Sequence, residues 1–104
     1  MDQEGADPNF TATGAVAEDK VTVTVTGEVD MSTADAMFRA ATKDNTTAAI
    51  IDLREVTFFD SAAIHALLQL ADRYGDALTV LPSAQVRRVL EISGLATQPW
   101  LTGP

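Results

Sequence analysis

The stretch from Ile50 to Leu70, IIDLREVTFFDSAAIHALLQL, constrains the fold more than any other part of the chain. An apolar run around Ile51 and Leu53 is typical of a buried strand, and Val56 to Phe59 is expected to lead the chain out of it. A helical pattern begins directly afterwards. A strand that feeds straight into a helix is the repeating unit of α/β folds.

The predicted helix has a clear start. Asp60 is expected to be its N-cap, with the first turn at Ser61 or Ala62 and the end near Tyr74. Residues at i, i+3, i+4 and i+7 spacing define its expected buried face: Ile64, Leu67, Leu68 and Ala71. Ser61 falls near solvent, where a phosphate of about −1.5 to −2 charges would meet unpaired N–H groups at the positive end of the helix dipole. Such a site can be modified without unfolding the domain.

Upstream, the pattern predicts a hairpin. Phe10 to Val16 is expected to be a first strand, and Ala17 to Lys20 a polar turn. Alternating valines and threonines from Val21 to Thr26 predict the second strand, which we expect to end over Gly27 to Asp30. Ser32 is the expected N-cap of a helix that ends near Asn45.

Downstream, Thr47 to Leu53 is almost wholly apolar, which favours a strand covered on both faces. A strand over Ala77 to Leu81 is expected to lie parallel to it. Ser83 is the expected cap of a last helix, and Gly94 its C-terminal glycine. Trp100 is expected to cover an edge of the core.

Length and charge limit the function. The 104 residues fit one domain, and we expect an acidic flexible tail over residues 1–9 followed by a domain over residues 10–104. The net charge of −8 argues against nucleic acid and against direct membrane binding. No signal peptide or membrane-spanning run is present in the sequence, so a cytoplasmic location is expected. The excess of acidic residues either keeps a small domain soluble or matches a basic docking patch on a partner.

Catalytic patterns are weak. Asp60, Ser61 and His65 would suggest a serine hydrolase, but the glycines of a nucleophile elbow are missing and Asp60 is explained as a cap. With no cysteine and one histidine, a transition-metal site is not expected. Glu28 and Asp30 fit either a strand-end turn or a carboxylate pair. We therefore expect a protein that has no enzymatic activity and binds no cofactor.

Three segments, taken together, resemble the STAS domain, in particular the bacterial anti-sigma-factor antagonists. They are GEVD at Gly27 to Asp30, DLREVTFFDS at Asp52 to Ser61, and PSAQVRRVLEISGL at Pro82 to Leu95. The resemblance covers roughly residues 10 to 98. It implies an α/β two-layer STAS-like domain, with a mixed sheet of four or five strands and helices mainly on one face.

The resemblance also implies a regulatory site. The family's phosphorylated serine maps onto Ser61, and the motif reads DSAAI where the family has a second serine and a glycine. The implied function is a partner switch that binds an anti-sigma factor of the GHKL ATPase/serine kinase class and releases it once that kinase phosphorylates Ser61. A phosphatase is expected to reverse the reaction. The expected docking residues are Asp30, Met31, Ser32, Asp60, Ser61, Ala62, Ala63 and Ile64.

A second interpretation remains open. Ala62 and Ala63 replace the two residues that follow the serine in the family motif. The protein would then be a constitutive STAS interaction subunit of a transport or stress-sensing complex, without phosphorylation.

Overall fold

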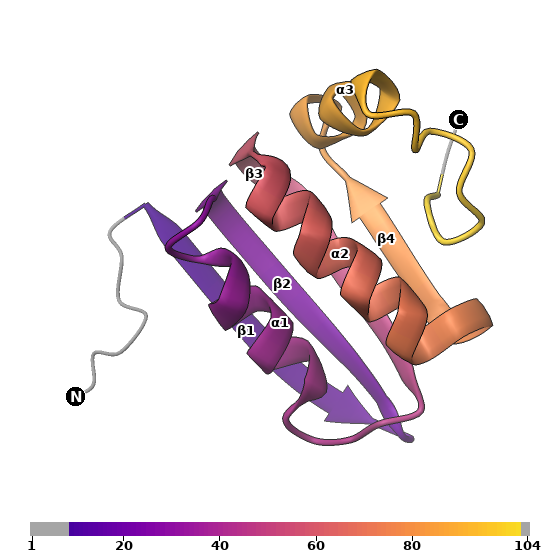
Figure 1. Cartoon of the computed structure of the whole chain (residues 1–104). Helices are drawn as coiled ribbons and strands as arrows, with labels where there is room; N and C mark the ends of the chain where they lie inside the picture. Colours follow the sequence, from indigo (N-terminus) through magenta and orange to yellow (C-terminus); the bar gives the residue numbers. More distant parts are fainter. Residues whose placement is uncertain (1–8, 103–104) are drawn as a thin grey trace.

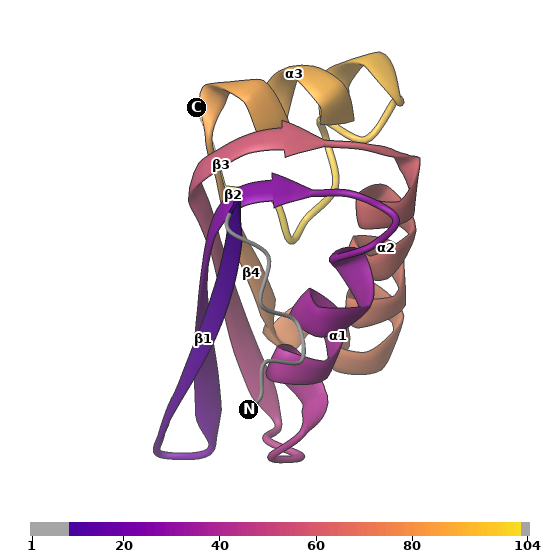
Figure 2. The ribbon, with the colours of Figure 1, turned by 90° about the vertical axis from the view of Figure 1, so that its left-hand side faces the viewer.

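In this computed structural model, which describes residues 9–102, the chain forms a two-layer α/β domain (Figures 1 and 2). The sheet has four strands in chain order: β1 (Phe10–Ala17), β2 (Lys20–Val29), β3 (Ala48–Phe59) and β4 (Leu78–Pro82). β1 is antiparallel to β2, whereas β2, β3 and β4 are parallel. The expected mixed sheet is confirmed. Except for Asn9, the tail expected over residues 1–9 lies outside the described residues.

The helices define the second layer. Helices α1 (Ala34–Thr42) and α2 (Ser61–Tyr74) cover one face of the sheet, and α3 (Ala84–Ile92) lies beyond the end of β4 (Figure 2). A short 3-10 turn, η1 (Gly75–Ala77), connects α2 to β4. The largest fully buried side chains belong to one hydrophobic core: Val21, Val23, Val25, Val29, Met37, Ile51, Leu53, Val56, Leu67, Leu70, Val80 and Leu90. Figure 2 shows no helix over the opposite face of the sheet within the described part of the chain.

The predicted hairpin is confirmed. Glu18 and Asp19 have φ angles of 54° and 66°, and two consecutive positive values at a hairpin tip favour a tight turn that matches the strand twist. β1 and β2 pair without interruption from Phe10 opposite Gly27 to Ala17 opposite Lys20.

Two strand ends differ from expectation. β2 does not stop at Gly27, and β3 does not end at Leu53; both continue until Val29 lies beside Phe59. Two register shifts make this possible, because they keep Val56 and Phe59 on the core side. The extension delivers the residues after both strands to the same end of the sheet. The prediction that the strand from Thr47 to Leu53 is covered on both faces is wrong. Helices α1 and α2 lie over one face of the sheet, and Asp52 lies on the other face of β3.

The buried face of α2 was predicted incorrectly apart from Leu67. Leu68 is 41% exposed, and Ile64 and Ala71 are only partly buried. The buried residues are Ala63, Ala66, Leu67, Leu70 and Tyr74, which also follow helical spacing. The two alanines give this face its small side chains, which permit close packing of the helix against the core.

The C-terminal predictions are confirmed. Ser83 Oγ accepts the N–H of Val86 at 3.1 Å, and the N–H of Leu95 reaches Leu90 O at 2.8 Å across Gly94. Trp100 is 6% exposed, and its carbonyl accepts the N–H of Val80 on β4.

Candidate functional site

The turn between β3 and α2 is fixed by Asp60. Its Oδ1 accepts the N–H of Ala63 at 3.1 Å, and its carbonyl accepts the N–H of Ile64 at 3.0 Å. The predicted N-cap is therefore confirmed. Ser61 is the first residue of α2 and is exposed. Its hydroxyl has no hydrogen bond with residues 9–102.

The turn between β2 and α1 is built around Asp30. Its Oδ1 accepts hydrogen bonds from Ser32 N at 2.9 Å and Ser32 Oγ at 2.8 Å. The hydrogen bond from the Ser32 hydroxyl, followed by that from the Ser32 N–H, holds the pKa of Asp30 below its usual value. The carboxylate thus remains ionised at neutral pH.

Ser32 is not the N-cap of α1, contrary to the prediction. Its hydroxyl is committed to Asp30, and the N-cap position falls on Thr33, whose side chain does not bond to the helix. Instead, Thr33 Oγ1 accepts the N–H of Asp30 and donates to the carbonyl of Glu28, both at 2.9 Å. The buried Thr33 therefore stabilises the turn rather than the helix.

The two turns lie next to each other. The N–H of Asp60 donates to the carbonyl of Val29 at 3.3 Å, at the point where β2 and β3 end together. A groove of about 210 Å³ runs between α1 and α2, and Met31 and Ala62 both line it. The structure thus brings together the two segments that the sequence analysis singled out, Asp30 to Ser32 and Asp60 to Ile64.

The expected docking residues differ in solvent exposure. Met31 is 83% exposed, and Ser32 and Ser61 are also exposed. Four others are partly buried: Asp30, Asp60, Ala62 and Ile64. Ala63 is 0% exposed, so its side chain belongs to the core and we remove it from the docking surface.

The geometry does not assemble a hydrolase site. The Asp60 carboxylate bonds to backbone rather than to His65, and His65 lines the α1–α2 groove opposite Asp35. Within residues 9–102, no group of three His, Cys, Asp or Glu side chains could hold a metal ion. No helix of the described chain is long and apolar enough to cross a membrane.

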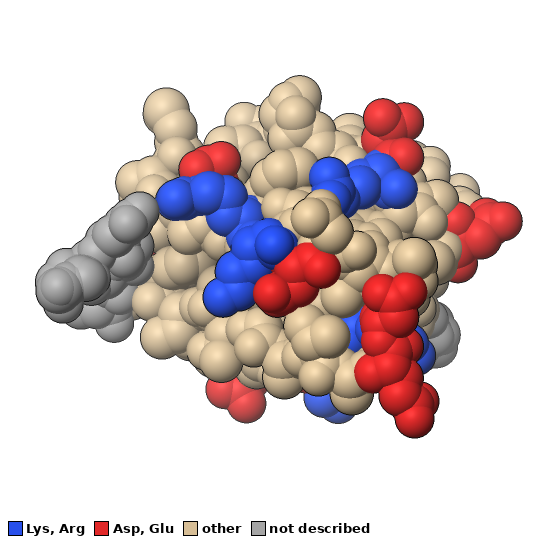
Figure 3. Space-filling view, turned by 90° about the horizontal axis from the view of Figure 1, so that it is seen from below, with Lys and Arg blue, Asp and Glu red and all other residues tan. Residues whose placement is uncertain are grey.

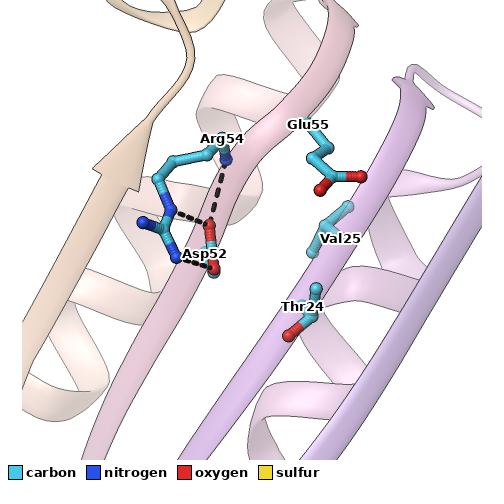
Figure 4. Close-up of a pocket in the computed structure, with 5 residues that line it drawn as sticks. All are labelled: Thr24, Val25, Asp52, Arg54 and Glu55. Carbon is cyan, nitrogen blue, oxygen red and sulfur yellow. Dashed lines mark hydrogen bonds and ion pairs between the residues drawn. The ribbon is translucent and has the colours of Figure 1, made fainter.

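A second surface feature was not anticipated from the sequence. Thr24, Val25, Asp52, Arg54 and Glu55 line an open depression of about 440 Å³ on the helix-free face of the sheet (Figure 4). Arg54 donates two hydrogen bonds to the Asp52 carboxylate, from Nε at 2.9 Å and from Nη2 at 2.8 Å. The Arg54 hydrogen bond lowers the pKa of Asp52. The i, i+2 spacing of the pair on a strand is the sequence signal, because it places both side chains on one face.

Charges of both signs are mixed on the face in Figure 3, among large uncharged areas. This face therefore carries no field of a single sign.

Comparison with known proteins decides the family. The family described as "Mlab, STAS domain" matches residues 13–103. The chain belongs to the STAS domain family. The resemblance in the three sequence segments is thereby confirmed. A search of curated proteins gave no significant match.

Solved structures of three other proteins or protein forms share the fold. An anti-sigma factor antagonist from Mycobacterium paratuberculosis is 27% identical, with a TM-score of 0.76, over 91% of this chain and 86% of that chain. The anti-sigma factor antagonist SpoIIAA in its unphosphorylated form is 22% identical, with a TM-score of 0.69, over 89% and 85%. The Bacillus cell fate determinant SpoIIAA in its phosphorylated form is also 22% identical, with a TM-score of 0.63, over 89% and 88%.

Proposed function

We propose that this STAS domain is an anti-sigma-factor antagonist that works by binding rather than by catalysis. Unmodified, it binds an anti-sigma factor; phosphorylated at Ser61, it releases that partner. The similarity to the mycobacterial antagonist supports the general function. The observation that carries the switch is the exposed, unbonded Ser61 hydroxyl on a helix that another residue, Asp60, already caps.

The proposed docking surface, here called the switch surface, consists of Asp30, Met31, Ser32, Asp60, Ser61, Ala62 and Ile64. Its centre is the pair of adjacent turns. Met31 offers a flexible apolar side chain at 83% exposure, and the ionised Asp30 offers a fixed negative charge beside it. This combination suits a partner surface with an apolar pocket bordered by a basic side chain.

Phosphorylation would change this surface without disturbing the fold. At the first position of α2, the phosphate meets the N–H groups of Ser61 and Ala62, because Asp60 already occupies those of Ala63 and Ile64. It also adds about −1.5 to −2 charges to a surface that already contains Asp60, the preceding residue, and Asp30 in the neighbouring turn. Burying that charge against a partner is unfavourable, and a loss of about 2.7 kcal/mol reduces affinity about a hundredfold.

The partner we propose is an anti-sigma factor of the GHKL ATPase/serine kinase class, which phosphorylates Ser61, with a phosphatase that restores the serine. The exchange would take place in the cytoplasm.

Titration calorimetry with the purified anti-sigma factor tests the switch. We expect Ser61→Asp to weaken binding at least about tenfold, which corresponds to about 1.4 kcal/mol. Ser61→Ala should bind like the unmodified protein. Thr97→Asp, at an exposed residue far along the chain from the switch surface, is the charge control and should have no effect. Equal binding by all four proteins would refute the switch.

The second candidate is a constitutive STAS interaction subunit of a transport or stress-sensing complex. The observation that favours it is the DSAA sequence, in which Ala62 is partly buried and Ala63 fully buried. It predicts stable association with a partner that is not a kinase, and no effect of Ser61→Asp on that association.

A further inference from the structure

The two edges of the sheet differ in their backbone hydrogen bonding. At the β4 edge, Val80 N donates to Trp100 O at 2.8 Å, and Thr102 N donates to Val80 O at 3.1 Å, so the C-terminal segment pairs with the strand. At the other edge, no strand among residues 9–102 pairs with the outer side of β1 (Figure 1). Among residues 9–102, the backbone of β1 is therefore open on one side.

The register identifies the open backbone groups. Asn9 O accepts the N–H of Glu28 at 2.7 Å, and the β1–β2 pairing continues from there without a shift. In an antiparallel pair, alternate residues direct both their N–H and C=O groups toward the partner strand. Residues 9, 11, 13, 15 and 17 thus bond to β2. The outward groups belong to Phe10, Ala12, Gly14 and Val16.

The sequence and pairing of β1 lack the features that usually prevent strand association. The sequence of β1, FTATGAVA, contains no charged residue and no proline, and its pairing with β2 contains no bulge. Natural edge strands normally carry lysine, proline, a bulge or a covering segment. Val16 adds an apolar side chain at 49% exposure.

We propose that β1 pairs antiparallel with β1 of a second copy of this chain, joining two four-stranded sheets into one sheet of eight strands. The outward N–H and C=O groups belong to the even-numbered residues from Phe10 to Val16. A two-fold axis through Thr13 therefore places outward groups of one copy opposite outward groups of the other. In that register Ala12 faces Gly14 of the second copy, and Phe10 faces Val16. The exposed Val16 side chain then packs against an apolar neighbour, as in a cross-strand pair.

A second copy fits this edge better than other occupants. The antiparallel arrangement places the acidic hairpin tips, Glu18 and Asp19, at opposite ends of the shared strand pair. The segment before β1, MDQEGADP, contains three acids, a glycine and a proline, types that are depleted in strands. Because each copy has a net charge of −8, association should strengthen as salt screens the repulsion. This proposal does not depend on Ser61.

Sedimentation velocity of the full chain over a concentration series, at low and high salt, tests the proposal. We expect a reversible dimer that is favoured by salt. Val16→Pro removes one outward N–H and no bond to β2, and it should weaken dimerisation at least about tenfold. Val16→Ile keeps the N–H and an apolar β-branched side chain and is the matched control, expected to dimerise like the unmodified chain.

Amide hydrogen exchange gives a second measurement. We expect the N–H groups of Ala12, Gly14 and Val16 to be protected in concentrated samples and to exchange on dilution, while Thr11 and Thr13 stay protected throughout. Should Val16→Pro fail to fold, Thr13→Lys replaces it, since two lysines would face each other at the axis. A monomer at every concentration and salt, an unaffected dimer in a folded edge variant, or concentration-independent protection of the three outward amides would each overturn the proposal.

Discussion

Asp60 Oδ1 accepts the backbone N–H of Ala63 at 3.1 Å, which caps the helix that begins with Ser61. The residue that starts α2 structurally and the residue proposed to be modified are thus adjacent but distinct. This division allows the Ser61 hydroxyl to be changed while the helix start is preserved.

Removing the cap should reduce stability. We expect Asp60→Ala to lower the free energy of unfolding by about 1 kcal/mol, because Ala63 N loses its acceptor. Asp60→Asn, which retains a capping oxygen, should stay within a few tenths of a kcal/mol of the unmodified protein. Urea denaturation measures both variants. Equal losses in the two would show that the charge of Asp60, not its capping oxygen, matters.

Gly27 should not tolerate a side chain. Its φ is +88°, and an added Cβ would lie 1.8 Å from Asn9 O. We expect Gly27→Ala to destabilise the fold by more than about 2 kcal/mol, because backbone strain and a steric clash combine. Gly94→Ala is the control: its φ of +78° is also positive, but no atom lies within 4 Å of an added Cβ, so only the backbone cost of about 1 kcal/mol is expected. Similar melting temperatures for the two variants would contradict this account.

Tyr74 connects α2 to the end of α1. Its hydroxyl donates to Ala41 O at 2.5 Å, and the residue is 8% exposed. Tyr74→Phe leaves that buried carbonyl without this donor, so we expect a loss of about 1–2 kcal/mol in chemical denaturation. Binding through the switch surface should be unchanged, since Tyr74 lies at the opposite end of α2 from Ser61.

Acid should weaken the pairing of Asp52 with Arg54. Because the folded-state pKa of Asp52 is lowered, its carboxylate stabilises the fold above the unfolded-state pKa, and this contribution is lost as the pH falls through the folded-state pKa. The loss is therefore expected below about pH 4. In Asp52→Asn, the decrease in unfolding free energy between neutral and acidic pH should be smaller. An identical pH dependence in both proteins would rule out this contribution.

Much of this fold could be predicted from the sequence because local signals agreed with tertiary packing. The valine–threonine alternation gave β2, and Asp60, Ser83 and Gly94 marked helix ends that the structure confirms. The full length of β3 was missed because Arg54 and Glu55 interrupt the apolar pattern. Only the register shifts against β2 return Val56 and Phe59 to the core.

The position of Ser61 in the fold was predicted from the sequence. The motif placed Ser61 at an exposed helix start, which the structure confirms. Periodicity could not distinguish two stripes of equal spacing on α2, so the wrong stripe was predicted to be buried. Ala63 was assigned to the docking surface because it follows Ser61 in the motif, although its side chain is buried. The hydrogen bond from Ser32 to Asp30 replaced a predicted cap, because a nearby carboxylate competed for the same hydroxyl.

The most direct test of the partner switch is intact-mass analysis with peptide mapping, after incubation with ATP and the cognate anti-sigma kinase. We predict one added phosphoryl group, located on Ser61, and none on Ser61→Ala, while Ser93→Ala is labelled like the unmodified protein. An unlabelled protein, under conditions in which the same kinase labels another antagonist, would contradict the switch and favour the constitutive interaction subunit.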